Sequence, residues 1–429
     1  MMHVLYKAGH ALSGMETWGY HLVNVIIHAV SSVIVFLVAM ALMSKGLPGS
    51  APWAALFTSL IFASHPTNAD TVSWIGSVPD LSFTMFYLLA FYLHMKARPF
   101  LAALTFFLSL LSKETAATLL AVLILADVLV ERRSLALLGP WIRRYAPLAV
   151  TVLVYVGLRF YATNGAIFTY SAATSTDAAG YLMALVPALA KYISSLVFPT
   201  QQVFYIYLTF GRAPSPAEVV TALLVVAALG LSFYGRKKEP LLFFTFMWTI
   251  VAVIPAIYFG WSMWGAPVYA ARFLYLPSAA LALFIGGIAV RFGRVAPLAQ
   301  AFTAIATVLI IVFSGLAFQR TYAWESAYTL WRDASAKDPS YVAARFHYGV
   351  ELASRGLLDE AIVEFIAVNN IAPANSAAMN TLGAAYARKG VMMEAIAKFR
   401  KAVDIDPGNE AAQKNLEKAL SSAKPLENN

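Results

Sequence analysis

Long apolar runs follow one another along most of the chain, and they constrain its fold more than any other feature. They cover residues 20–42, 52–64, 81–95, 99–111, 115–130, 146–161, 181–198, 217–234, 240–259, 272–290 and 297–318. A helix needs about 20 apolar residues to cross the hydrocarbon core of a bilayer. Charged residues make up only 12% of the chain, against about a quarter in soluble domains. The sequence therefore predicts an all-α, polytopic membrane helix bundle.

Basic residues fall on alternate connections between these runs. One set of connections holds Lys45, Lys96, Arg98, Arg132, Arg133, Arg143, Arg144, Arg236, Lys237, Lys238, Arg291 and Arg294, and the other set holds Lys113, Arg159, Arg212 and Arg272. The positive-inside rule predicts that the first set is cytoplasmic. Residues 1–318 carry the whole net charge of +9. Loop topology explains this charge better than binding of nucleic acid does.

The run 181–198 would break the alternation if it crossed the membrane, because Arg236 would then lie outside. Pro187 and Lys191 lie in its middle, so we interpret it as an interfacial helix on the outer face. About ten spans remain, with both ends of the chain outside. The polar stretch 1–19 would then have to cross the membrane unaided, so we expect that the chain lacks an upstream helix and loop.

The C-terminal quarter carries an internal repeat. Pro339, Pro373 and Pro407 are 34 residues apart, which is the period of the tetratricopeptide repeat. Small and large apolar residues occupy corresponding offsets in the two full units, namely Gly349, Ala361 and Phe365 in the first and Gly383, Ala395 and Phe399 in the second. The pattern predicts stacked helical hairpins that form an α-solenoid.

These patterns divide the chain into a membrane domain, 1–318, and a tetratricopeptide-repeat domain, 319–429. The second domain is predicted to contain a half repeat 324–339, full repeats 340–373 and 374–407, and a capping helix 409–423. On its concave face, Asn380 is the candidate for binding the backbone of an acceptor polypeptide or a partner protein.

A short polar island, residues 62–80, separates two apolar runs on the side opposite to the basic loops, and it contains His65, Asp70 and Asp80. Ionisable groups at membrane level are costly and commonly functional. A carboxylate there can act as general base toward an acceptor hydroxyl, so Asp70 and His65 are the catalytic candidates. Asp70 could instead cap a helix, and His65 could end one. Asp80 has the position of a helix cap, and we keep it as a supporting residue.

Three basic residues on the outer side are candidates for binding a lipid phosphate: Lys113, Arg159 and Arg272. Arg272 lies at the outer end of a predicted span, and the guanidinium group is suited to bidentate phosphate binding. Lys113 and Glu114 share a short turn, with Glu114 as a supporting residue. Self-pairing of these two residues and interfacial anchoring of the arginines are the simpler alternatives.

His21, Asn24 and His28 lie on one face of the first apolar helix. We expect this face to point into the bundle and to make structural hydrogen bonds. The histidines have no ligand partners at usable spacing, so no metal site is predicted. The chain has no cysteine, which excludes disulfides and thiolate ligands.

Four segments, Gly19–His28, His65–Ile75, Leu111–Glu114 and Arg272–Ser278, followed by the repeats, carry a family resemblance. They resemble the transmembrane and tetratricopeptide-repeat-containing O-mannosyltransferases and their bacterial relatives, in the same order over nearly the whole chain. The resemblance implies the GT-C fold and a polyprenyl-phosphate sugar donor. It also implies an active site on the non-cytoplasmic face and transfer of mannose or a similar hexose to a protein hydroxyl.

The sequence departs from that family in two places. The family carries an acidic pair with a catalytic aspartate in its first external loop, which would lie upstream of Met1 here. The principal catalytic carboxylate therefore has no counterpart in this sequence, and we interpret this as a truncated start. The family usually has a glutamate before the arginine that corresponds to Arg272, where this chain has Ala271.

The sequence thus favours a membrane glycosyltransferase that works by a single displacement with inversion. Asp70 would deprotonate the acceptor, while Arg272 and Lys113 would offset charge on the departing phosphate. A catalytically inactive membrane-anchored repeat scaffold and a lipid-linked oligosaccharide ligase of similar build are the alternatives. Beyond the donor lipid, no cofactor is predicted. We expect a bacterial inner membrane, with the active site and the repeats in the periplasm.

Overall fold

The computed structural model describes residues 2–44, 51–134, 136–165, 178–200, 205–207, 214–264, 268–293 and 295–423. The loop residues Lys45, Arg212 and Arg294 lie outside these ranges. The chain divides into two compact units, Met1–Thr321 and Tyr322–Asn429. We call them the membrane unit and the repeat unit.

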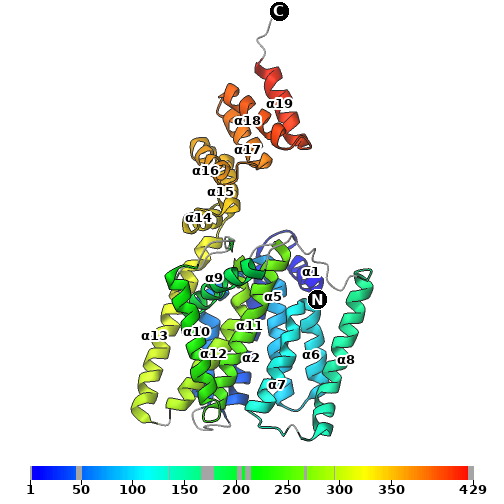
Figure 1. Ribbon diagram of the computed structural model, residues 1–429, viewed down its shortest axis with the longest axis vertical. Coiled ribbons are helices and arrows are strands. Elements are labelled where there is room, and N and C mark those ends of the chain that lie inside the picture. The colour runs from blue at the N-terminus through cyan, green and yellow to red at the C-terminus, as the bar shows by residue number, and fades with distance from the viewer. Residues whose placement is uncertain are drawn as a thin grey trace, which may run out of the picture. The chain divides into compact units, whose positions relative to one another are not determined.

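The membrane unit consists almost entirely of helices. In order they are α1 (Met2–Ser13), α2 (Trp18–Met43), α3 (Ala51–Ser64), α4 (Pro66–Ser73), η1 (Ile75–Ser77), α5 (Val78–Met95), α6 (Pro99–Ser112), η2 (Glu114–Thr118), α7 (Leu119–Leu129), α8 (Leu138–Ala162), α9 (Ala178–Val197), α10 (Pro216–Gly235), α11 (Pro240–Trp264), η3 (Ala271–Leu274), α12 (Tyr275–Phe292) and α13 (Ala296–Thr321) (Figure 1). One short antiparallel pair, β1 (Tyr205–Tyr207) with β2 (Val268–Ala270), joins the segments that precede α10 and α12.

Seven helical stretches in the described residues are long and apolar enough to cross a membrane. They contain α2, α5, α8, α10, α11, α12 and α13. Three further helices at predicted spans are shorter: α3 and α6 have 14 residues each, and α7 has 11. The protein is therefore an all-α polytopic membrane protein, as predicted, while the count of ten spans stays a prediction.

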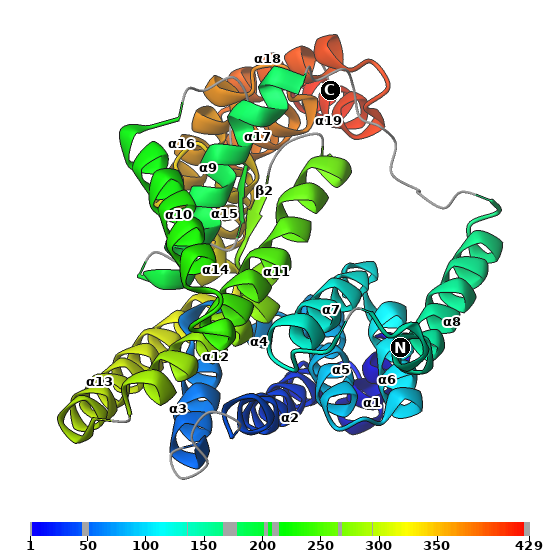
Figure 2. The same cartoon turned by 60° about the horizontal axis from the view of Figure 1, so that its bottom comes forward.

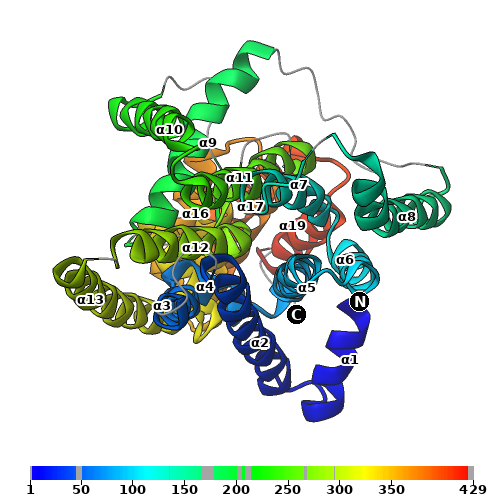
Figure 3. The same cartoon turned by 90° about the horizontal axis from the view of Figure 1, so that it is seen from below.

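Helix α9, predicted to be interfacial, contains Pro187 within its 20 residues. It lies across the ends of the long helices rather than alongside them (Figure 1 and Figure 3). Its side chain Tyr192 is fully buried against Tyr269, with ring centroids 5.1 Å apart. This orientation is the one that an interfacial helix would have.

The core of the membrane unit lies between α2, α3, α5, α6, α7, α11 and α12. The ring of Phe91 in α5 packs against that of Trp248 in α11, with ring centroids 4.5 Å apart. At Gly286 of α12, an added Cβ would lie 1.9 Å from the hydroxyl of Thr58 in α3, so only glycine permits this close approach. Helices α8, α10 and α13 lie at the periphery (Figure 2 and Figure 3), and only 6%, 6% and 11% of their apolar windows are buried.

A buried polar network joins three helices at one end of the bundle. The carboxylate of Asp127 in α7 is fully buried and accepts hydrogen bonds from Arg144 of α8 at 2.7 and 2.9 Å. The hydroxyl of Tyr145 donates to it at 2.8 Å, and His94 Nε2 lies 3.0 Å away. Arg133 Nε donates at 3.2 Å. The network ties α8 to α5 and α7, because a buried carboxylate requires such partners.

The repeat unit is a series of helical hairpins. Its helices are α14 (Ala327–Lys337), α15 (Val342–Ser354), α16 (Leu358–Ile371), α17 (Ser376–Arg388), α18 (Met392–Ile405) and α19 (Glu410–Ala423), preceded by η4 (Tyr322–Trp324). Helices α15, α17 and α19 begin 34 residues apart, and so do α16 and α18. The predicted repeats 340–373 and 374–407 each contain one hairpin.

Glycines at equivalent positions let the two helices of each hairpin approach closely. A Cβ at Gly349 would lie 2.6 Å from the ring of Phe365, and one at Gly383 would lie 2.7 Å from the ring of Phe399. Both rings are buried. The repeating small and large residues seen in the sequence therefore form the packing contact between the helices.

We expect the substitution Asp127→Asn to destabilise the membrane unit strongly. It leaves Arg144 without its buried counter-charge, and removing one partner of a buried ion pair costs about 3–5 kcal/mol. Thermal unfolding of the purified chain in detergent measures the loss. The control is Glu239→Gln, because Glu239 pairs with Arg291 where both side chains are more than a third exposed, and such pairs contribute about 0–1 kcal/mol. An equal decrease in melting temperature for the two variants would contradict the stabilising role of the buried network around Asp127.

Candidate functional site

The polar island folds into short helical elements that lead into α5. His65 caps the N-terminus of α4, and Pro66 occupies its first turn, while Pro79 lies in the first turn of α5. Proline suits these positions because it lacks an N–H and its φ angle is already helical. Asp70 lies inside α4 and Asp80 inside the first turn of α5, where Ser77 occupies the cap position. The capping interpretation is therefore wrong for both aspartates.

Asp80 is the centre of a small charged cluster at the N-terminal end of α5. Lys113, which follows α6, places Nζ 2.5 Å from Asp80 Oδ1. Arg272, in η3, places Nε 4.0 Å from Asp80 Oδ2. The side chain of Asp80 is 6% exposed, and those of Lys113 and Arg272 are 17% and 16% exposed. The carboxylate of Asp80 thus faces two cations that remain partly exposed. We call these three residues the Asp80 cluster.

Aromatic rings hold the two cations of the Asp80 cluster. The ring of Phe273 lies 4.5 Å from Lys113 Nζ and 4.9 Å from Arg272 Cζ. Arg272 also lies 4.5 Å from the ring of Trp74. Cation–π contacts of this kind fix the direction of a charge without neutralising it. The positions of the cations are therefore set by rings as well as by Asp80.

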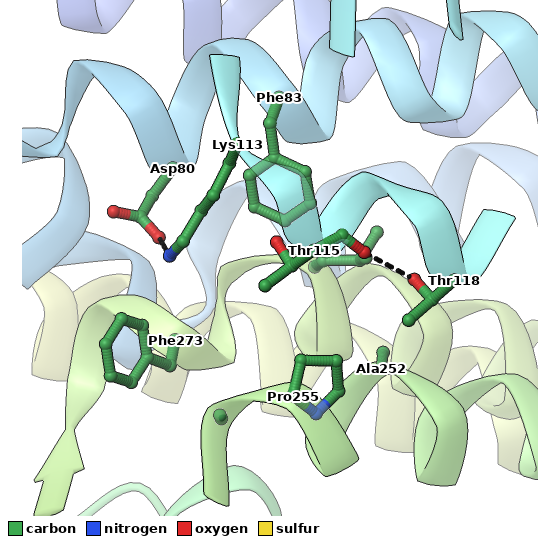
Figure 4. A pocket seen from close by; sticks show the side chains of 10 residues that line it. Asp80, Phe83, Lys113, Thr115, Thr118, Ala252, Pro255 and Phe273 are labelled. Atoms are coloured by element: carbon green, nitrogen blue, oxygen red, sulfur yellow. Dashed lines mark hydrogen bonds and ion pairs between the residues drawn. The ribbon is translucent and has the colours of Figure 1, made fainter. Parts of the chain in front are cut away.

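A small pocket opens beside the Asp80 cluster (Figure 4). It is lined by Asp80, Phe83, Lys113, Thr115, Thr118, Ala252, Pro255, Ala256, Phe273 and Leu276. The hydroxyl of Thr118 donates to the backbone carbonyl of Thr115 at 2.9 Å. The hydroxyl of Thr115 is buried and has no hydrogen-bond partner among the described residues. The pocket thus offers polar groups on one wall and apolar groups from α11 on the other.

Arg159, the third predicted phosphate ligand, lies near the C-terminal end of α8. Its Nη1 is 3.7 Å from Glu114 Oε2, and it donates to the hydroxyl of Tyr155 at 3.1 Å. Because Glu114 directly follows Lys113, this pair neighbours the Asp80 cluster. Lys113 pairs with Asp80 of the neighbouring helix α5, so the simpler interpretation, self-pairing of Lys113 with Glu114, is wrong.

Asp70, the predicted catalytic carboxylate, has a different partner. Arg320, in the last turn of α13, donates from Nε to Asp70 Oδ1 at 2.8 Å. The two side chains are only 2% and 5% exposed. The predicted set is therefore divided: Lys113 and Arg272 meet at Asp80, whereas Asp70 pairs with Arg320.

His65 is fully buried, and both ring nitrogens are engaged. Nδ1 lies 2.7 Å from the hydroxyl of Thr67, and Nε2 lies 3.0 Å from the carbonyl oxygen of Leu196 in α9. Burial lowers the pKa of His65 below its ordinary value, although the bond to Leu196 opposes this. A neutral imidazole that donates from Nε2 fits these contacts, and it ties the polar island to α9.

Asp80 also influences α1. Burial, and then the negative charge of Asp80, raise the pKa of Tyr6. The hydroxyl of Tyr6 donates to the backbone carbonyl of Ile75 at 3.3 Å. Near Asp70, burial raises the pKa of Tyr269, and the Asp70 charge adds to this increase. The charge of Asp80 therefore acts on Tyr6, and the charge of Asp70 acts on Tyr269.

Asn24, a supporting candidate, donates from Nδ2 to the carbonyls of Val72 and Trp74 at 3.0 and 3.1 Å. It thereby holds the turn after α4 against α2. His28 lies 2.7 Å from the hydroxyl of Tyr275, while His21 is partly exposed on the same helix.

In the repeat unit, the side-chain oxygen Oδ1 of Asn380 accepts a hydrogen bond from Asn415 Nδ2 at 2.9 Å. A polypeptide ligand would have to compete with α19 for that atom. Within the part of the chain that the structure describes, no group of three or more histidine, aspartate or glutamate side chains could hold a metal ion.

Two residues that contact the predicted site residues are not indicated by the sequence: Arg320, which pairs with Asp70, and Phe273, which contacts Lys113 and Arg272. Arg320 ends the last apolar run, a position that ordinarily indicates interfacial anchoring. Phe273 lies within a run of apolar residues and carries no separate signal. Only their contacts distinguish these residues from ordinary membrane-helix residues.

Comparison with known proteins gives a consistent set of relatives, although no model of a protein family matches the chain. Over 140 residues, 30% of this chain and 16% of the relative, it is 32% identical to protein O-mannosyl-transferase TMTC2 of Mus musculus. It is 34% identical to protein O-mannosyl-transferase Tmtc1 of Drosophila melanogaster over 131 residues, 29% of this chain and 15% of the relative. A protein O-mannosyl-transferase of Caenorhabditis elegans is 24% identical over 378 residues, which are 82% of this chain and 50% of that protein.

The chain thus spans half or less of the length of these relatives. All three relatives are named protein O-mannosyl-transferases. The resemblance predicted from the sequence motifs is confirmed: the chain is similar to protein O-mannosyl-transferases of the TMTC group.

Proposed function

We propose that the chain belongs to a membrane glycosyltransferase of the GT-C type that uses a polyprenyl-phosphate sugar. The sugar, mannose or a similar hexose, passes to a protein hydroxyl on the non-cytoplasmic face. The observation that supports this most is the convergence of Lys113 and Arg272 on Asp80 beside a pocket. Two partly exposed cations beside a pocket form a site where an anionic phosphate can bind while Asp80 continues to hold both of them.

In the proposed reaction, the acceptor oxygen forms a bond to the anomeric carbon while the bond from that carbon to the phosphate oxygen breaks. The leaving polyprenyl phosphate gains negative charge, which Lys113 and Arg272 offset. Arg159, which pairs with Glu114 next to Lys113, is proposed as a further contact of the phosphate. The acceptor proton passes to a carboxylate, so charge and atoms balance without a further cofactor.

The two aspartates have different parts in this scheme. Inversion by single displacement requires the base on the face of the sugar opposite to the leaving phosphate. Asp80 contacts the phosphate-binding cations, so we assign it to positioning Lys113 and Arg272. Asp70 stays the candidate base. Because Asp70 is buried with Arg320, this ion pair has to open before the carboxylate can accept a proton.

The repeat unit would present the acceptor. Its hairpins recur with the 34-residue period of the tetratricopeptide repeat, and repeats of this kind form concave surfaces that bind extended polypeptides. Asn380 is the proposed contact. Peptide binding there would replace its hydrogen bond with Asn415.

The residues at the two ends of α5 support a proposal for the side of the membrane on which the site lies. Asp80, Lys113 and Arg272 meet at one end of α5, whereas His94, Asp127 and Arg144 meet at the other. Lys96 and Arg98 directly follow the second end. Under the positive-inside rule, the Asp80 cluster is then non-cytoplasmic. We propose a bacterial inner membrane with a periplasmic site.

Substitutions of the two cations, Lys113 and Arg272, test the proposal. In membranes that contain the full chain, polyprenyl-phosphate mannose with labelled mannose is the donor, and label on protein is measured. We expect Lys113→Met to lower transfer about 100-fold or more, because the loss of one group that stabilises a developing charge has effects of this size. Arg272→Lys should retain an intermediate rate, since lysine keeps the charge without the guanidinium fork. Lys96→Met, at the other end of α5, is the matched control.

The aspartates are tested by separating kcat from KM. Asp80→Asn is expected to raise KM for the donor more than it lowers kcat. Asp70→Asn is expected to lower kcat by about 10²–10⁴-fold, the contribution of a general base. The kcat of each variant is divided by its fraction of folded protein, because Asp70→Asn also breaks a buried ion pair. If the activity of Asp70→Asn falls only in proportion to its unfolded fraction, Asp70 is a structural residue. If wild-type membranes transfer no sugar while the repeats bind polypeptide, the scaffold alternative replaces the enzyme.

A further inference from the structure

An apolar groove lies between α6 and α8, at the end of the membrane unit that carries the Asp127 network. It has a volume of about 760 Å³ and is lined by Pro99, Phe100, Ala103, Arg143, Ala146, Pro147 and Val150. Pockets of this size commonly hold small-molecule ligands. Both helices contribute a proline and an alanine, which leave space where larger side chains would close the contact. Helix α8 lies beside α6 at the edge of the unit (Figure 3).

The walls of the groove suit a hydrocarbon chain. Phe100 and Val150 are 79% and 57% exposed, and only 6% of the apolar window of α8 is buried. In a membrane, surfaces of this kind face lipid. Next to Arg143 in the sequence, Arg144 and Tyr145 hold α8 to Asp127 of α7. The position of α8 at this end of the groove is therefore set by contacts with α7.

The mouth of the groove is positive. Arg143 lines it, and Arg98 occupies the N-cap position of α6 next to Pro99. Both side chains are exposed, and neither forms an ion pair within the described ranges. The nearby carboxylate of Asp127 is already bound by Arg144 and Arg133. Uncompensated positive charge therefore lies where the apolar groove reaches the membrane surface.

We propose that this groove binds one anionic phospholipid, with its phosphate at Arg143 and an acyl chain between α6 and α8. Basic pockets between transmembrane helices on the cytoplasmic side are known to bind anionic headgroups. The groove begins at the N-terminal end of α6, whereas Lys113 follows the C-terminal end. The 14 residues of α6 separate these ends by about 21 Å at 1.5 Å per residue. The bound phospholipid is therefore distinct from a lipid at the Asp80 cluster, and the proposal does not rest on the proposed reaction.

Native mass spectrometry of the purified full chain, titrated with phosphatidylglycerol or phosphatidylcholine, tests the site. We expect one phosphatidylglycerol to bind in preference to phosphatidylcholine. Arg143→Gln should weaken binding of phosphatidylglycerol about fivefold, the effect of one basic residue near an anionic lipid.

The control Lys237→Gln removes an exposed charge from the connection between α10 and α11 and should leave binding unchanged. Ala146→Phe keeps every charge but fills the groove, and should weaken binding of phosphatidylglycerol by at least the same factor. Val150→Trp is a second groove-filling variant if Ala146→Phe does not fold.

Three outcomes would overturn the proposal. The first is equal binding of the two phospholipids. The second is the same loss in Lys237→Gln as in Arg143→Gln, which would indicate attraction to general surface charge. The third is displacement of phosphatidylglycerol by millimolar inorganic phosphate, which would show that the acyl chain does not contribute to binding.

Discussion

Ionised side chains inside an apolar helix bundle need partners of opposite charge, and this requirement connects the helices of the membrane unit. Taking an unpaired charge out of water costs far more than the few kcal/mol by which proteins are stable. Asp80, Asp70 and Asp127 each pair with basic residues from another helix or connection. These pairs join the ends of α5 and α6, of α4 and α13, and of α7 and α8. The helices cannot shift along one another without breaking them.

The two ends of α5 differ in a way that suits different tasks. At the Asp127 end, the carboxylate is fully buried and has several donors, so it can do little except hold α8. At the Asp80 end, Lys113 and Arg272 keep partial exposure and lie against rings beside a pocket. The buried Asp127 network therefore holds the helices together, whereas the partly exposed Asp80 cluster contains cations that an anion can reach.

Much of the architecture could be predicted from the sequence, because apolar runs and a 34-residue period are local patterns. The site could be predicted only in part. Charge at the outer helix ends indicates Lys113 and Arg272, and they do converge. A helix start ordinarily means capping, which predicts only a supporting role for Asp80, yet Asp80 lies at the centre of the cluster. An arginine at the end of an apolar run has an ordinary explanation, so the sequence does not indicate Arg320.

The sequence by itself determined that the chain is a helical membrane protein, where its long apolar helices and its repeat hairpins lie, and which family it resembles. Only the tertiary structure decided which carboxylate meets which cation. Asp80 and Lys113 are 33 residues apart, and Asp70 and Arg320 are 250 apart. Contacts at such separations depend on how the helix ends meet, and the packing of the whole bundle sets that arrangement. Residue type shows that a charge needs a partner, whereas packing determines which partner lies within reach.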